Sequence, residues 1–132
     1  MGEIKISPKF FYDSIIEGNL MESYVHVYTG DGKGKTTAAL GVAIRTLCVG
    51  KKVYCGQFLK DGKYSEYLLP KFFPLLTMVG FGPSGFIHEK SSQNEINIAK
   101  EMTQKGFETC KKILKSGEYD LVILDEINIA IF

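Results

Sequence analysis

The sequence has no large excess of charge of either sign. Its 132 residues include 16 lysines and arginines against 15 aspartates and glutamates, which leaves a formal net charge of +1. Binding to nucleic-acid backbones or to acidic membrane surfaces depends on concentrated positive charge. Nucleic acid and acidic membranes are therefore poor candidates as partners of this chain.

Cysteine is scarce and apolar runs are short. Cys48, Cys55 and Cys110 are odd in number and show no CxxC spacing, so we expect neither a disulfide framework nor a metal or redox site of that kind. No run approaches the roughly 18 apolar residues that a membrane span requires, and charged residues interrupt the first 20 residues. These features favour the reducing cytoplasm and give no indication of secretion or membrane insertion.

The pattern of apolar residues is typical of a single globular domain in which strands alternate with helices. Hydrophobic residues make up 45% and charged residues 23% of the chain, which suits a buried core. The predicted strands lie in 24–29, 51–59, 75–81 and 119–128. The predicted helices lie in 35–49, in 64–73 with a break around Pro70, and from the capping box of Ser92 and Glu95 to Gly117. This alternation predicts an α/β fold with a mostly parallel sheet and helices on both faces.

Residues 1–20 form an arm that is separate in pattern from a nucleotide-binding domain over 21–132. The stretch PKFFYDSIIEGNL, residues 8–20, predicts one short amphipathic helix that ends near Gly18. Two interpretations stay open. The arm is either an ordered or frayed tail, or it covers a site or a neighbouring subunit.

A glycine-rich loop follows the first predicted strand. Gly34, Lys35 and Thr36 match the end of the GxxxxGK[ST] phosphate-loop signature, although Thr29 stands where Gly or Ala is usual. The glycines allow backbone N–H groups to converge on an anion at a helix N-terminus. Lys35 and Lys33 can contact phosphates, and Thr36 can bind Mg²⁺. A glycine-rich turn with solvated lysines is the alternative, but the order of strand, loop and helix favours nucleotide binding. The expected nucleotide-binding residues are Thr29, Gly30, Asp31, Gly32, Lys33, Gly34, Lys35, Thr36 and Thr37.

Two carboxylates follow the apolar run 121–124. Asp125 or Glu126 can hold Mg²⁺ together with Thr36, usually through water, while the other carboxylate orients a nucleophile or a second water. A charged turn at a strand end is the alternative. Carboxyl ends of parallel strands meet at one edge, so we expect these residues near the phosphate loop. The combination predicts a three-layer, P-loop NTPase-like fold of the recombinase type and a metal site made of Thr36, Asp125 and Glu126.

Several stretches together resemble the ATP:corrinoid adenosyltransferases of the cobalamin pathway. They are VYTGDGKGKTTAALG, QFLKDGKYSEYLL, GFI and YDLVILDEIN, in that order, and the resemblance covers 24–131. It implies transfer of the 5′-deoxyadenosyl group of ATP to the cobalt of a reduced Co(I) corrinoid, with release of triphosphate. ATP, Mg²⁺ and a corrinoid co-substrate are thus implied, with Lys35 and Glu126 as catalytic candidates. The resemblance also implies a homodimer and an electron-donor protein as a partner.

Other residues are assigned to the site only by this resemblance. Gln57, Lys60 and Glu66 are implied in the nucleotide and corrinoid pocket, and a solvated loop is the alternative for each. Phe86 matches an aromatic residue that helps to displace the lower axial ligand of cobalt. His88 stands where some members have Trp and is a candidate cobalt ligand, with a surface histidine as the alternative.

The stretch after the acidic pair departs from the family. The sequence stops at Phe132, whereas the family continues for a few dozen residues with further strands. In related sheets the next strand inserts between the acidic strand and the phosphate-loop strand. Without it, backbone groups at the centre of the sheet would lack partners. We therefore expect a fragment, unless the first 20 residues or a partner chain fill this gap. An ATP-binding module without turnover and an ordinary P-loop ATPase or kinase remain as alternatives.

Overall fold

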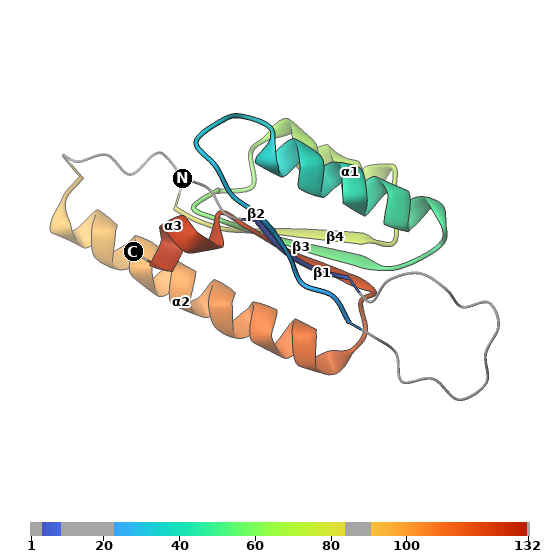
Figure 1. The fold of residues 1–132 in the computed structure, drawn as a ribbon. Helices are drawn as coiled ribbons and strands as arrows, with labels where there is room; N and C mark the ends of the chain where they lie inside the picture. The colour runs from blue at the N-terminus through green and yellow to red at the C-terminus, as the bar shows by residue number, and fades with distance from the viewer. Residues whose placement is uncertain (1–3, 9–22, 84–90, 132) are drawn as a thin grey trace.

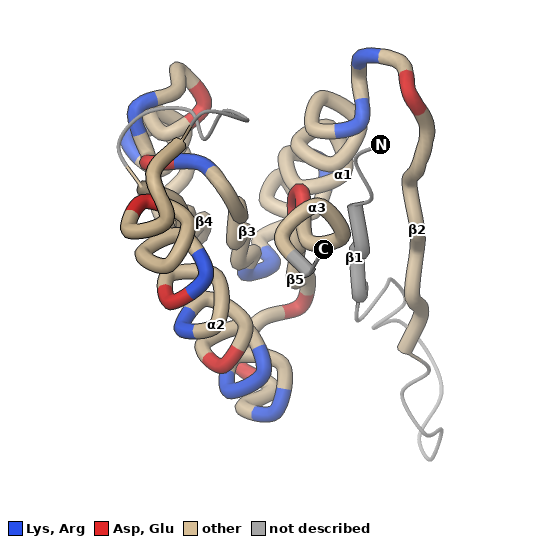
Figure 2. The backbone as a smooth tube through the Cα atoms, turned by 90° about the vertical axis from the view of Figure 1, so that its left-hand side faces the viewer, with Lys and Arg blue, Asp and Glu red and all other residues tan. Residues whose placement is uncertain are grey.

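The computed structural model describes residues 4–8, 23–83 and 91–131 (Figure 1). Its five strands form one sheet in the order β2-β1-β5-β3-β4, which Figure 2 shows from the side. The strands are β1 (Ile4–Pro8), β2 (His26–Tyr28), β3 (Val53–Phe58), β4 (Leu76–Phe81) and β5 (Leu121–Asp125). The helices are α1 (Lys35–Cys48), the 3-10 helix η1 (Ser65–Lys71), α2 (Gln93–Ser116) and α3 (Ile127–Ile131). Helix α1 covers one face of the sheet, and α2 and α3 cover the other.

Three strands form the parallel part of the sheet. β3 pairs in parallel with β5 on one side and with β4 on the other, so that Val53 lies opposite both Leu121 and Leu76. All six residues of β3 are buried, as expected for a strand covered on both faces. The predicted α/β fold, with parallel strands flanked by helices, is confirmed.

β1 occupies the position between the strand before the phosphate loop and the acidic strand. It pairs antiparallel with both, and Ile6 lies opposite His26 of β2 and Ile123 of β5. Because β2 and β5 are each antiparallel to β1, they run in the same direction. Part of the first 20 residues thus fills the gap at the centre of the sheet. Apart from Pro8, the helix predicted over 8–20 lies outside the described residues.

The sheet separates two apolar cores. Successive residues of β3 point to opposite faces, so that Val53 and Cys55 pack beneath α1 while Tyr54 and Phe58 pack with Cys110 of α2. Residues of β5 divide in the same way. The core under α1 contains Ala39, Ala43, Leu47, Val53, Cys55, Leu76, Leu121 and Ile123. The core under α2 and α3 contains Tyr54, Phe58, Cys110, Val122 and Ile127.

The boundaries of α1 and α2 follow their sequence patterns closely, whereas α3 begins at Ile127, inside the strand predicted over 119–128. The predicted capping box before α2 is present, because Ser92 accepts a bond from the Glu95 amide and the Glu95 side chain accepts one from the Ser92 amide. Gly117, with φ 66°, ends this helix in the left-handed conformation. The helix predicted over 64–73 is the 3-10 helix η1, which contains Pro70. Within the described residues, no helix combines the length and apolar character that crossing a membrane requires.

Candidate nucleotide site

The glycine-rich loop connects β2 to the first turn of α1. Gly30 and Gly34 have φ values of 148° and 111°, which residues with a side chain rarely adopt. A Cβ atom at either position would meet no atom within 4 Å, so backbone conformation and not lack of space requires glycine there. Lys35 donates hydrogen bonds to the carbonyl oxygens of Gly30 and Gly32 at 2.6 and 2.7 Å. The Lys35 ammonium is therefore held against the backbone of its own loop.

Most other loop residues predicted to bind nucleotide are exposed to solvent. The exposed side chains include those of Thr29, Asp31, Lys33 and Thr37, whereas Lys35 and Thr36 are half-buried. Figure 2 shows charge of both signs along the connection from β2 to α1. An anion at the start of α1 would meet backbone N–H groups and the positive end of the helix dipole.

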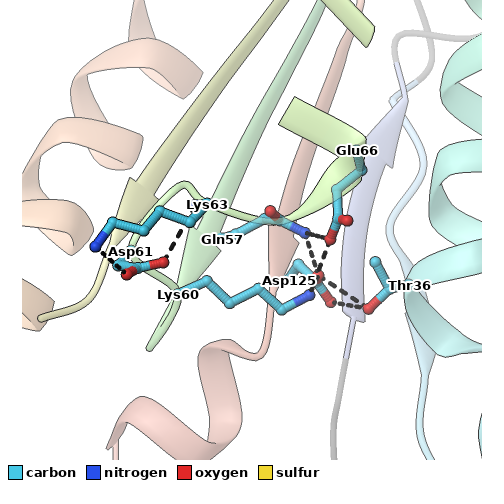
Figure 3. A network of polar contacts seen from close by, with 7 residues as sticks. All are labelled: Thr36, Gln57, Lys60, Asp61, Lys63, Glu66 and Asp125. Atoms are coloured by element: carbon cyan, nitrogen blue, oxygen red, sulfur yellow. Dashed lines mark hydrogen bonds and ion pairs between the residues drawn. The ribbon is translucent and has the colours of Figure 1, made fainter. Parts of the chain in front are cut away.

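Asp125, the last residue of β5, connects this loop to the acidic strand. Its side chain is 1% exposed. The hydroxyl of Thr36 donates to the carboxylate, with Oδ1 and Oδ2 at 3.1 and 3.0 Å. Gln57 Nε2 donates to Oδ2 at 2.9 Å, and Lys60 Nζ lies 3.3 Å from the same oxygen. Figure 3 shows these side chains converging on Asp125 from α1, β3 and the loop after β3.

Glu66 of η1 extends this network on the β3 side. Gln57 Nε2 lies 3.4 Å and Lys60 Nζ 3.5 Å from Glu66 Oε1. Burial disfavours the charged form of Lys60, but the carboxylates of Asp125 and Glu66 raise its pKa above the usual range. Lys60 therefore remains an ammonium ion between two carboxylates. The structure brings together Thr36, Gln57, Lys60, Glu66 and Asp125, whereas Phe86 and His88 lie outside the described residues.

Gly80 in β4 and Gly82 just after this strand determine where the loop after β3, which carries Lys60, lies. Neither glycine is among the predicted site residues. A Cβ atom on Gly80 would lie 2.5 Å from the carbonyl oxygen of Lys60, and one on Gly82 would lie 2.5 Å from its amide nitrogen. Only glycine allows the loop to pass this close. Leu59 at the start of the loop has a φ of 57°, which is rare for a residue with a side chain. A glycine within a strand pattern signals such a close backbone approach.

Glu126 lies apart from the Asp125 network. It has a φ of 62°, an unusual conformation for a residue with a side chain. Its Oε2 atom is buried and has no hydrogen-bond partner in the described part of the chain; the same holds for Gln57 Oε1. A buried polar atom without a partner is costly in free energy. Gln57 Oε1 and Glu126 Oε2 are thus acceptors still available to a ligand or to water.

Thr36 and Asp125 fit a magnesium ion. Mg²⁺ prefers oxygen ligands, and it is usually held by one or two protein oxygens together with phosphates and water. The Thr36 hydroxyl and the Asp125 carboxylate supply such oxygens beside the phosphate loop. Within the described residues, no group of three His, Cys, Asp or Glu side chains could hold a metal ion by itself. The residues present therefore suit a metal that arrives with a nucleotide better than a metal held by protein alone.

A glycine-rich loop at the start of a helix, next to the carboxyl ends of parallel strands, defines an α/β protein of the P-loop NTPase-like class. Residues 21–132 match the family described as ATP:corrinoid adenosyltransferase BtuR/CobO/CobP. The chain therefore belongs to this family.

Relatives named as corrinoid adenosyltransferases agree with this assignment. The chain is 34% identical over 106 residues to the corrinoid adenosyltransferase of Escherichia coli K12, an alignment that covers 76% of this chain and 50% of that protein. It is 32% identical over 106 residues to that of Pseudomonas aeruginosa, covering 80% and 51% of the two chains. An uncharacterized protein of Nostoc, all2391, is 31% identical over 127 residues, covering 86% of this chain and 33% of the relative. The chain thus spans about half the length of these adenosyltransferases. No solved structure matches it significantly.

Proposed function

We propose that this protein binds ATP with Mg²⁺ and transfers the 5′-deoxyadenosyl group to the cobalt of a reduced Co(I) corrinoid, in adenosylcobalamin biosynthesis. The family and the names of the relatives support this activity. The observation that carries the proposal is the contact between Thr36 and Asp125, because it joins the phosphate loop to the acidic strand end. We place the nucleotide site in residues 21–132, with residues 1–20 as an added arm.

The phosphate loop would stabilise the leaving group. In this reaction the bond between the ribose C5′ and its oxygen breaks, and its electron pair leaves with triphosphate. Lys35, Lys33 and the loop amides would stabilise the negative charge that develops there. Mg²⁺ held by Thr36 and Asp125 would neutralise part of the same charge. Glu126, next to Asp125 at the same strand end, is proposed as the second carboxylate of the site.

The reaction needs no nucleophile from the protein. The reduced corrinoid supplies the electron pair of the new cobalt–carbon bond, and cobalt rises formally from +1 to +3. The protein must hold the nucleotide and bring the corrinoid close to C5′. Gln57, Lys60 and Glu66 are proposed to line this side of the site, with Phe86 and His88 near the corrinoid. We also propose that the protein forms a homodimer and that an electron-donor protein reduces the corrinoid.

The test is an anaerobic incubation of the chain with MgATP and a chemically reduced corrinoid. Triphosphate released in step with the absorbance spectrum of an adenosylated corrinoid is the expected result. Orthophosphate without a change in the corrinoid would instead indicate an ordinary P-loop ATPase. Bound ATP without any product would identify an ATP-binding module without turnover. A Lys35→Met variant in the same assay shows whether any product depends on the phosphate loop.

A further inference from the structure

The Asp125 carboxylate already has a positively charged partner from its own chain. Lys60 Nζ lies 3.3 Å from Asp125 Oδ2 and 3.5 Å from Glu66 Oε1. The Lys60 and Glu66 side chains are 16% and 17% exposed, so little water screens these pairs. Figure 3 shows the Lys60 ammonium and the Thr36 hydroxyl on two sides of the Asp125 carboxylate. The ammonium thus lies beside the oxygens that would hold Mg²⁺.

We propose that Lys60 is a built-in counter-ion of Asp125 that competes with Mg²⁺ for this carboxylate, and that Glu66 keeps Lys60 paired when the metal binds. The inference rests on the assignment of Asp125 as a magnesium ligand in the proposed function. Lys60 is in this role a positioning residue. Lys60 determines the affinity of the site for a metal ion that binds before the nucleotide or together with it.

The order of the contacts at Asp125 Oδ2 favours Lys60 as the donor that gives way. Within the described residues this oxygen accepts from Gln57 at 2.9 Å, from Thr36 at 3.0 Å and from Lys60 at 3.3 Å. A carboxylate oxygen with these three donors has no free lone pair for a metal ion. The longest contact belongs to the only charged donor of the three, and a divalent cation at Asp125 would repel this ammonium.

The backbone of the loop restricts how Lys60 can move. Because the Lys60 carbonyl and amide lie against Gly80 and Gly82, the main chain cannot shift toward β4. The ammonium must therefore leave Asp125 by side-chain rotation. Glu66 already lies within ion-pair distance on this side, and the ring of Tyr64 lies 5.2 Å from the ammonium. Both can hold the cation once Asp125 binds a metal.

Charge sets the direction of the expected effect. Lys60, Glu66 and Asp125 together carry a net charge of −1, and removal of the Lys60 ammonium leaves two carboxylates. A divalent cation is attracted more strongly to this arrangement. Loss of the ammonium should therefore increase metal affinity by about tenfold, as expected for a partly buried charge a few ångströms away.

The test is a titration with Mn²⁺ alone, a paramagnetic substitute for Mg²⁺, followed by electron paramagnetic resonance without nucleotide or corrinoid. Lys60→Met and Lys60→Gln should both bind Mn²⁺ about tenfold more tightly than the unchanged chain. The second variant keeps a hydrogen-bond donor for Asp125 and so tests the idea even if the first does not fold. Lys63→Met is the matched control, because Lys63 pairs with Asp61 and is 73% exposed; it should leave Mn²⁺ affinity unchanged.

Unchanged or weaker Mn²⁺ binding in the folded Lys60 variants would overturn the proposal. A loss of ATP affinity in EDTA in these variants, with unchanged Mn²⁺ binding, would assign Lys60 to the phosphates instead. The metal titration is independent of the adenosyl-transfer assay. Absence of triphosphate together with tighter Mn²⁺ binding would reject the proposed function and retain the role of Lys60.

Discussion

The hydroxyl of Thr36 lies 3.0 and 3.1 Å from the two carboxylate oxygens of Asp125, a residue 89 positions further along the chain. Thr36 is in the first turn of α1, and Asp125 is the last residue of β5. β1 lies between β5 and β2, the strand that leads into the phosphate loop before α1. The contact therefore joins the two segments that flank the central strand β1.

Replacing Thr36 with Val should remove the hydrogen bond that joins the phosphate loop to Asp125 of the acidic strand. Valine has a similar shape but no hydroxyl, so Asp125 would lose one donor while keeping Gln57 and Lys60. We expect the free energy of unfolding to fall by about 1.5 kcal/mol, the usual contribution of a hydrogen bond to a charged group. Urea denaturation measures this change. Thr109→Val is the control, because the Thr109 hydroxyl donates to the Lys105 carbonyl of its own helix at an exposed position; equal losses in both variants would contradict a special role for Thr36.

The phosphate-loop lysine offers a direct test of nucleotide binding. Lys35 is the half-buried lysine of the loop and contacts its carbonyl oxygens, whereas Lys33 is exposed. We expect Lys35→Met to lower ATP affinity by at least about tenfold, because an ammonium ion forms strong hydrogen bonds to phosphate oxygens. Lys33→Met should have a smaller effect because water screens its charge. Equilibrium dialysis with MgATP gives both affinities, and a larger loss in the Lys33 variant would contradict this order.

Local patterns in the sequence predicted most of the fold. Sequence patterns predict the strand before the phosphate loop, the helices α1 and α2 and the buried acidic strand, because periodicity and capping are properties of neighbouring residues. The contribution of β1 could not be assigned, since which strand fills the gap beside β5 depends on pairing between distant segments. The position of the loop that carries Lys60 could not be predicted either, because it depends on how closely Gly80 and Gly82 approach the backbone of this distant segment.

The central strand β1 should be essential for stability. Ile6 lies opposite both His26 and Ile123, so a proline there would remove a backbone donor between two paired strands. We expect Ile6→Pro to lower the free energy of unfolding by about 2 kcal/mol or more. Ile6→Val keeps the N–H group and the β-branched shape and serves as the control. If urea denaturation gave the same stability for both variants, β1 would not pair in solution as it does here.

The capping box of α2 predicts a stability change in acid. The Ser92 backbone N–H and hydroxyl both donate to Glu95, and these bonds lower the pKa of its carboxyl. A carboxyl whose pKa is lower in the folded state stabilises the fold above its unfolded pKa, and this contribution is lost as the pH falls through the folded pKa. The unchanged chain should therefore melt at a higher temperature than Glu95→Gln at pH 7. The difference should shrink below the usual range of a glutamate pKa; a difference independent of pH would contradict an ionic cap.

Gly80 offers a test of the loop that carries Lys60. A Cβ atom there would lie 2.5 Å from the Lys60 carbonyl oxygen and 2.8 Å from the Tyr67 hydroxyl. Since a backbone atom cannot move aside as a flexible side chain can, Gly80→Ala should destabilise the protein by about 1–3 kcal/mol. Gly41→Ala is the control, and we expect this change to increase the stability of the protein. Gly41 lies in α1 with no atom within 4 Å of its Cβ position, so alanine should stabilise this helix by about 0.5–1 kcal/mol.

The Gly80→Ala variant also tests whether metal affinity depends on the position of the loop that carries Lys60. If the loop shifts to accept the new methyl group, Lys60 moves relative to Asp125, and the Mn²⁺ affinity should change together with the stability. Gly41→Ala should change stability alone, because α1 carries this residue on its exposed side. A Gly80→Ala chain that unfolds at the same urea concentration as the unchanged chain, with the same Mn²⁺ affinity, would show that the loop after β3 does not depend on the close approach of β4.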